Sequence, residues 1–100
     1  MVKQEVNLFV YGTLMSGHSN EHRLPKSSIR TKAVLKGFRL DTTKKIPRIF
    51  FDDKQEVQGE LVSCKLSKWE LFKLDLFEWK YTRTKVFVNK KPCWVYVAKH

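Results

Sequence analysis

One short stretch near the start of the chain combines residue types that could hold a ligand. The apolar pair Phe9–Val10 runs into Tyr11, Gly12, Thr13 and Leu14 before the chain enters a polar loop. A glycine lets the backbone approach a ligand closely, and consecutive amides that leave a strand can receive a carboxylate or a developing oxyanion. A plain strand end is the alternative, and we favour the ligand-binding loop.

A pair of carboxylates later in the chain could carry out proton transfer. Asp75 and Glu78 are three residues apart, so on a helix they lie on nearly the same face. Glu78 also falls at the expected helix end, where the helix dipole disfavours a carboxylate, and a residue placed against local preference indicates function. Burial beside Phe77 and Trp79 would raise the pKa of Glu78 toward the range of a general acid or base. For Asp75 we expect a structural role, as a partner of Arg83 or of a backbone amide, and not that of a second catalytic acid.

The helix that would position these carboxylates is the segment SKWELFKLDLFEW, which begins at Ser67. Ser67 and Glu70 have the spacing of a capping box, in which each side chain accepts a hydrogen bond from the other residue's backbone amide. Trp69, Phe72 and Leu76 recur at three- and four-residue spacing, which predicts that this face packs in the core.

The rest of the chain is predicted to be mostly strands. β-Branched and aromatic runs indicate strands at residues 6–12, 33–40, 46–51, 57–66, 84–88 and 93–97. Pro47 makes the third of these a short or edge strand, and residues 89–92 are typical of a hairpin turn. A short helix is expected to begin at Ser19 or Asn20 and to end before Pro25. Strands on both sides of one helix predict an α+β fold, a small mixed β-barrel or sheet flanked by one clear helix and short helical segments.

Length and composition indicate a soluble protein. The 100 residues fit a single domain spanning residues 1–100, and 42% of them are hydrophobic, enough for a packed core. No apolar run approaches the roughly 20 residues of a membrane helix, and the N-terminus lacks the apolar stretch of a signal peptide. Cys64 and Cys93 show no metal or disulfide pattern, so we expect free thiols in a reducing compartment. These features predict a cytoplasmic protein with no membrane partner.

The formal net charge of +10 raises the possibility of an anionic partner. A basic β-domain that binds nucleic acid is one interpretation, in which the charge itself is the function. However, no basic run exceeds two residues, and the positive side chains alternate with apolar positions, as on the solvated faces of strands. We therefore expect only weak, non-specific contact with nucleic acid.

Several motifs in order along the chain resemble those of one protein family. They are VYGTL at residues 10–14 with Gly17 and Asn20, GFRLD at 37–41, IP at 46–47, VQGELV at 57–62, LDLFE at 74–78 and YTR at 81–83. Together they resemble the gamma-glutamylcyclotransferase-like family, which includes the gamma-glutamylamine cyclotransferases. The resemblance spans almost the whole chain, and it is carried by the order and spacing of the motifs.

The resemblance implies a small mixed β-barrel with a pocket at one end and a small-molecule gamma-glutamyl substrate. It assigns Tyr11, Gly12, Thr13 and Leu14 to the loop that holds the gamma-glutamyl group, largely through backbone amides, and Glu78 to the role of acid and base. The implied reaction is attack of the substrate's own α-amine on the γ-carbonyl, which releases an amine and 5-oxoproline. No metal or organic cofactor is implied.

The chain departs from the family pattern at Trp79, where the family usually has glycine. This departure leaves the amine half of the substrate open, and the oligomeric state is open as well. A catalytically silent family fold that binds a small anionic ligand through the same loop is a further alternative. His18 and His22 have the four-residue spacing of a metal pair, but no third ligand is evident and we interpret them as loop histidines.

Overall fold

The computed structural model describes residues 2–12, 14–44 and 47–98 and shows a mixed α+β fold, as predicted. In chain order the elements are β1 (Lys3–Val10), the 3-10 helix η1 (Glu21–Arg23), β2 (Ile29–Asp41), β3 (Arg48–Ser67), α1 (Lys68–Phe77), β4 (Tyr81–Val88) and β5 (Lys91–Ala98). The strands form one open five-stranded sheet in the order β2-β3-β1-β5-β4. β1 pairs in parallel with β5, and the other pairs are antiparallel.

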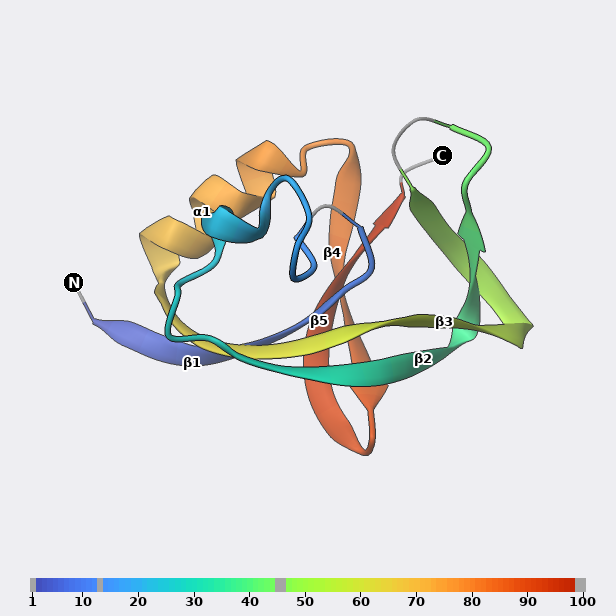
Figure 1. Ribbon diagram of the computed structural model, residues 1–100, viewed down its shortest axis with the longest axis horizontal. Coiled ribbons are helices and arrows are strands. Elements are labelled where there is room, and N and C mark those ends of the chain that lie inside the picture. The colour runs from blue at the N-terminus through green and yellow to red at the C-terminus, as the bar shows by residue number, and fades with distance from the viewer. Residues whose placement is uncertain (1, 13, 45–46, 99–100) are drawn as a thin grey trace.

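β1 is the central strand, and its side chains enter two separate cores. Val6, Leu8 and Val10 pack with Leu74 of α1 in one buried cluster. Phe9 points to the opposite face and packs in a second cluster with residues of β2, β3, β4 and β5. Because successive strand residues face opposite sides, a strand buried on both faces reads as a continuous apolar run. Figure 1 shows α1 and η1 together on one side of β1 and β3.

The β2–β3 hairpin is long and sharply bent. Pairing runs regularly to Lys36 opposite Glu56 and resumes at Phe38 opposite Phe51, so the strands are irregular around Gly37, whose φ is +89°. The prediction of two strands at 46–51 and 57–66 was therefore wrong, because the polar residues between them continue the same strand through the bend. The bend carries the start of β3 toward the end of β5 (Figure 1).

α1 begins with the predicted capping box but presents a different face to the core. The Glu70 amide donates to Ser67 Oγ (3.1 Å), and the Ser67 amide donates to Glu70 Oε1 (2.9 Å). The prediction that Trp69, Phe72 and Leu76 pack in the core was wrong, since they are 54%, 49% and 56% exposed. The core side of the helix carries Leu74, with Leu71 and Phe77 packed beside it. The helix is apolar on most sides, so spacing alone could not select the buried face.

The predicted hairpin turn and short helix both form, although the turn is limited to residues 89–90 because β5 begins at Lys91. Asn89 and Lys90, with φ of 52° and 65°, form the two-residue turn between β4 and β5 that a twisted hairpin favours. η1 is a single turn that ends just before the buried Leu24. Cys64 and Cys93 are free and buried. Within the described residues, no helix is long and apolar enough to span a membrane.

Gly59 of β3 offers a direct test of how tightly β3 packs on the end of β1. A Cβ at this position would overlap the Val10 carbonyl oxygen and lie 2.8 Å from the Phe9 ring. Both obstacles belong to the buried core and backbone, so Gly59→Ala should destabilise the protein by about 1–3 kcal/mol, as overpacking commonly does. Chemical denaturation would measure the loss. A Cβ at Gly12 meets nothing within 4 Å, so Gly12→Ala is the matched control, and an equally stable Gly59→Ala would contradict the packing argument.

Candidate active site

A small cavity lies where β1 ends, and residues from distant parts of the chain form its wall. The described lining residues are Phe9, Val10, Tyr11, Gly12, Leu14, Pro47, Glu78, Tyr81 and Tyr96. They come from β1 and the loop that follows it, the residue before β3, the end of α1, and strands β4 and β5. The cavity has a volume of about 40 Å³, enough for a few water molecules.

An ion pair holds the loop that follows β1. Arg30 Nη1 donates both to the Leu14 carbonyl oxygen (2.9 Å) and to Glu60 Oε1 (3.1 Å), and the Ser16 amide donates to the same carboxylate oxygen (2.8 Å). Burial acts to raise the pKa of Glu60, but the hydrogen bonds from Ser16 and Arg30 outweigh it, and the pKa lies below its ordinary value. Glu60 is therefore charged at neutral pH and fixes the loop between Leu14 and Ser16.

Glu78 is the C-cap residue of α1, and it lines the cavity. Its amide donates to the Leu74 carbonyl oxygen (2.9 Å), which completes the last helical turn. Its own carbonyl oxygen then accepts from the Tyr81 amide (2.9 Å), so the chain turns back at once into β4. These two backbone hydrogen bonds place the Glu78 carboxyl group and the Tyr81 ring in the same wall of the cavity.

The environment of Glu78 makes its carboxyl group a weaker acid than an ordinary glutamate. Burial raises the pKa of Glu78 from 4.5 to about 7, and the positive charge of Arg23 opposes this shift only in part. The Arg23 guanidinium lies over the Phe77 ring at 3.7 Å, and its Nε donates to Asn20 Oδ1 (3.1 Å). A carboxyl group with this pKa can both accept and return a proton near neutral pH.

The tyrosines around Glu78 are held by hydrogen bonds of their own. The Tyr11 hydroxyl donates to the Tyr96 carbonyl oxygen (2.6 Å), and the Tyr96 hydroxyl donates to Asp75 Oδ1 (2.7 Å). Arg83 Nε donates to the same oxygen of Asp75 (3.0 Å), which confirms the predicted Asp75–Arg83 partnership. Burial is the main reason that the pKa values of Tyr11, Tyr81 and Tyr96 lie above their ordinary value, so all three remain neutral at pH 7.

The structure brings most of the predicted site residues together. Tyr11, Gly12, Leu14 and Glu78 line the same cavity, and Thr13 lies outside the described residues. Their roles in binding and catalysis stay predictions.

Other parts of the site were not predicted. Pro47 and Tyr96 join the wall because of the bend in the β2–β3 hairpin and the parallel pairing of β1 with β5. The Arg30–Glu60 pair joins residues 30 positions apart, and no local pattern in the sequence marks such a contact. The one feature of the sequence that could have drawn attention to Glu60 is its position directly after Gly59, inside the VQGELV motif at residues 57–62.

The possible histidine pair does not form a metal centre with other ligands in the described part of the chain. His18 and His22 are both exposed. Among the residues that the structure describes, no three His, Cys, Asp or Glu side chains gather in a way that could hold a metal ion.

The fold and the cavity define a small α+β protein with a partly buried carboxyl group at one end of a mixed sheet. The chain belongs to the family described as "Gamma-glutamyl cyclotransferase, AIG2-like", whose model matches residues 8–100. No curated protein sequence matches the chain significantly.

Solved structures support the same assignment. YkqA from Bacillus subtilis is 29% identical with a TM-score of 0.79, over 96% of this chain and 36% of its own. An AIG2-like protein from Mus musculus is 25% identical with a TM-score of 0.75, over 95% of this chain and 78% of its own. A structure titled "Gamma-glutamyl cyclotransferase" is 24% identical with a TM-score of 0.69, over 97% of this chain and 68% of its own, and shows a similar fold.

The raised pKa of Glu78 predicts how stability depends on pH. The folded protein keeps the Glu78 proton up to about pH 7, whereas the unfolded chain releases it near pH 4.5. Stability contributed by the protonated form is therefore fully present below pH 4.5 and is lost as the pH rises through about 7. Glu78→Gln cannot ionise, so its melting temperature should match that of the wild type near pH 4.5 and exceed it at pH 8.

Two measurements check this expectation. Thermal melts across pH 4.5–8 compare wild type, Glu78→Gln and the exposed control Glu56→Gln, which also removes one negative charge. Carboxyl NMR of Glu78 should show a titration midpoint near pH 7. A midpoint near 4.5 would mean that the carboxyl group is hydrated and that the cavity does not bury it.

Proposed function

We propose that this protein is a gamma-glutamyl cyclotransferase that releases 5-oxoproline and an amine from a gamma-glutamyl amide. The observation that carries the proposal is the partly buried carboxyl group of Glu78, with its raised pKa, in the wall of a cavity that Tyr11, Gly12 and Leu14 also line. Residues 1–100 would act as one catalytic domain on a small-molecule substrate, without a metal or organic cofactor. We place the enzyme in the cytoplasm, where its two buried thiols would stay reduced.

The reaction rearranges bonds within the substrate and consumes no water. The α-nitrogen of the gamma-glutamyl group attacks its own γ-carbonyl carbon, so a new C–N bond forms as the bond to the leaving nitrogen breaks. The attacking ammonium loses two protons in total, and the leaving nitrogen gains both and departs as an ammonium ion. Glu78 would carry these protons between the two nitrogen atoms.

The acidity of Glu78 suits this transfer. An α-ammonium has a pKa of about 7.7–8.0, and an ordinary glutamate near 4.3 would face a gap of roughly 3.5 pKa units, or about 5 kcal/mol. With the pKa of Glu78 at about 7, the gap falls to roughly one unit, or about 1.4 kcal/mol. Glu78 is then basic enough to take the proton and acidic enough to return it.

The loop that follows β1 would hold the substrate in the orientation that the reaction needs. Nucleophile and electrophile belong to one short chain, so holding the folded conformer of the substrate achieves much of the rate enhancement. The hydroxyls of Tyr11 and Tyr96 already donate within the protein, so backbone amides of the loop are the donors we assign to the substrate. Gly12 would allow the close approach that this contact requires, because it carries no side chain.

The central test removes the proton carrier. Glu78→Gln keeps the size and hydrogen bonding of the side chain but cannot accept a proton, so turnover should fall by at least about 10²-fold. Release of 5-oxoproline from a panel of gamma-glutamyl amides measures the loss, with Glu56→Gln as the control for a lost negative charge. An active Gln variant would exclude Glu78 from the mechanism. A folded wild type that releases no 5-oxoproline would favour a silent, ligand-binding member of the family.

A second test addresses the basic charge. If the excess of lysine and arginine serves solubility or weak steering, binding to generic DNA and RNA at ~150 mM salt should be in the micromolar range or weaker. Lys32 and Lys36 are exposed on β2, so replacing both with Gln should leave 5-oxoproline release within a few-fold of wild type. Tight, sequence-selective binding that the double substitution abolishes would instead indicate a nucleic-acid-binding domain.

A further inference from the structure

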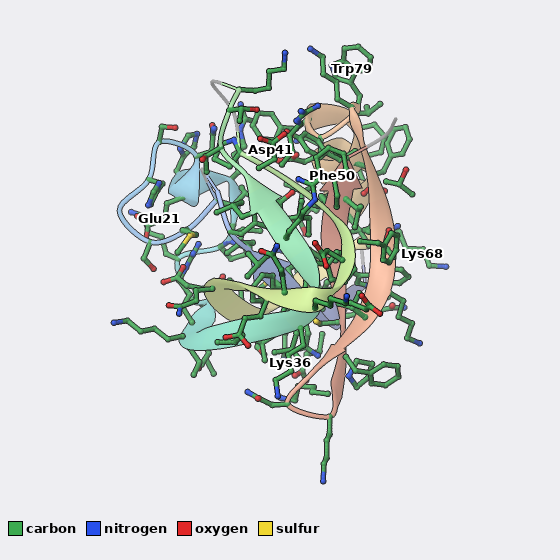
Figure 2. All side chains as sticks on the ribbon, turned by 90° about the vertical axis from the view of Figure 1, so that its right-hand side faces the viewer. Glu21, Lys36, Asp41, Phe50, Lys68 and Trp79 are labelled. Atoms are coloured by element: carbon green, nitrogen blue, oxygen red, sulfur yellow. The ribbon has the colours of Figure 1, made fainter. Side chains whose placement is uncertain are left out.

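The side of α1 that faces away from the core carries apolar side chains bordered by lysines. Its five exposed residues are Lys68, Trp69, Phe72, Lys73 and Leu76. At 3.6 residues per turn, these positions cover an arc of about 140° around the helix axis, with a lysine at each end of the arc. We call this surface the outer face of α1. Figure 2 shows Lys68 and Trp79 on the same side of the molecule, and Glu21 on the opposite side.

The middle of the outer face is apolar and continuous. The Trp69 and Phe72 rings stack on each other with 5.6 Å between their centres. Leu76 follows Phe72 by four residues, so it lies next to that ring on the helix surface. Trp79, just beyond the end of the helix, is 65% exposed. Large apolar side chains gathered on one exposed surface are typical of an interaction site.

The charged residues of the outer face are all positive. Of the ion pairs in the described part of the chain, none involves Lys68, Lys73 or Lys80. The two acidic residues of α1, Glu70 and Asp75, lie outside the arc, and each is engaged in a hydrogen bond and an ion pair within the protein. The outer face therefore offers free ammonium groups on both sides of an apolar centre, which is complementary to an anionic surface with an apolar interior.

An anionic lipid bilayer has this character. Tryptophan, phenylalanine and leucine side chains of a helix that lies in the membrane plane enter the boundary between headgroups and acyl chains. Lysines beside them reach outward to anionic headgroups, while their carbon chains cover apolar surface. A helix of this kind needs no spanning length. The prediction of no membrane partner was based on the lack of a spanning segment, and it did not consider a helix that lies on the surface.

Other partners fit the outer face less well. A two-fold dimer brings the same surface of both subunits together, so Lys68 and Lys73 would meet lysines with no carboxylate in the arc to pair with them. Single-stranded nucleic acid needs rings on which its bases can stack. Trp69 and Phe72 instead stack on each other, and Leu76 provides no ring.

We propose that the outer face of α1 binds the surface of an anionic lipid membrane. Trp69, Phe72 and Leu76 enter the lipid, and Lys68 and Lys73 contact the anionic headgroups. The cytoplasmic leaflet carries anionic lipids, so it is the surface that a cytoplasmic protein would meet. This inference does not depend on the proposed reaction.

Co-sedimentation with lipid vesicles measures the binding. At ~150 mM salt, the wild type should bind phosphatidylcholine vesicles that contain about one-third phosphatidylserine at least about tenfold more tightly than vesicles of phosphatidylcholine alone. The double variant Lys68→Gln with Lys73→Gln should bind the anionic vesicles about tenfold or more weakly than wild type, because it loses two headgroup contacts. Phe72→Gln with Leu76→Gln should show a loss of about the same size, because it removes apolar side chains from the lipid.

Matched controls separate this face from overall charge and overall apolar surface. Lys32→Gln with Lys36→Gln removes two exposed lysines from β2, and its affinity should stay within about threefold of wild type because these charges are distant from the bound surface. Phe51→Gln removes a side chain that is 71% exposed on β3, and it should bind as the wild type does. Melting temperatures show that each variant is folded.

Tryptophan fluorescence locates the bound surface while leaving its apolar character in place. Anionic vesicles whose acyl chains carry bromine should quench the wild type, since Trp69 and Trp79 would lie in the lipid. Trp69→Phe with Trp79→Phe keeps an aromatic ring at both positions and should still bind. The remaining tryptophan, Trp94, packs against the core and should not be quenched.

Each outcome decides the proposal. Failure of the wild type to bind anionic vesicles would overturn it, as would equal losses in the β2 control or quenching of Trp94 in the bound double variant. A wild-type dimer in sedimentation velocity that Phe72→Gln with Leu76→Gln separates would assign the face to a second copy instead. Tight binding to RNA that Lys68→Gln with Lys73→Gln abolishes would assign it to nucleic acid. None of these results changes the release of 5-oxoproline, which is assayed separately.

Discussion

The close approach of β3 to the end of β1 at Gly59 is the constraint on which the rest of the structure depends. A side chain there would collide with the Val10 carbonyl oxygen and the Phe9 ring. β1 lies against β3 here, and its alternating side chains enter both cores, with Phe9 on one face and Leu8 and Val10 on the other. The strand then ends in a region buried from both sides, and Tyr11, Gly12 and Leu14, which follow it, line the cavity there.

That loop and the end of α1 meet at the same place for separate reasons. The loop is tied to the neighbouring strands by Glu60 and Arg30. The helix end is fixed by the backbone hydrogen bonds on each side of Glu78 and by Leu74, which packs in the same core cluster as Val10. A carboxyl group held there loses hydration, so the fold itself creates the raised pKa. Ionisation of this carboxyl group lowers the stability of the fold at neutral pH. Such a loss of stability is common where a residue is placed for function.

The sequence predicted the parts of this arrangement that local chemistry controls. The capping box at Ser67 and Glu70 specifies where α1 begins, and the length of the apolar segment places Glu78 at its end. The turn at Asn89 follows equally from residue type. The family motifs indicated a loop and an acid in one site, and Tyr11 and Glu78 do line one cavity. What could not be predicted depends on long-range packing. Trp69 has the spacing of a core residue, but only the position of the helix on the sheet decides that Leu74 faces inward.

The placement of positive charge explains how a protein with a net charge of +10 keeps a carboxyl group with a raised pKa. A cation in direct contact with Glu78 would lower its pKa against the effect of burial and make it a weaker base. Of the described cations, Arg23 has the resolved effect on Glu78, and that guanidinium is engaged with the Phe77 ring and the Asn20 side chain. Arg48 and Lys80 line a neighbouring hollow that also includes Tyr81, and they do not line the cavity. The described part of the cavity wall is therefore apolar or neutral around the carboxyl group. The raised pKa of Glu78 thus depends on keeping these cations out of the cavity wall.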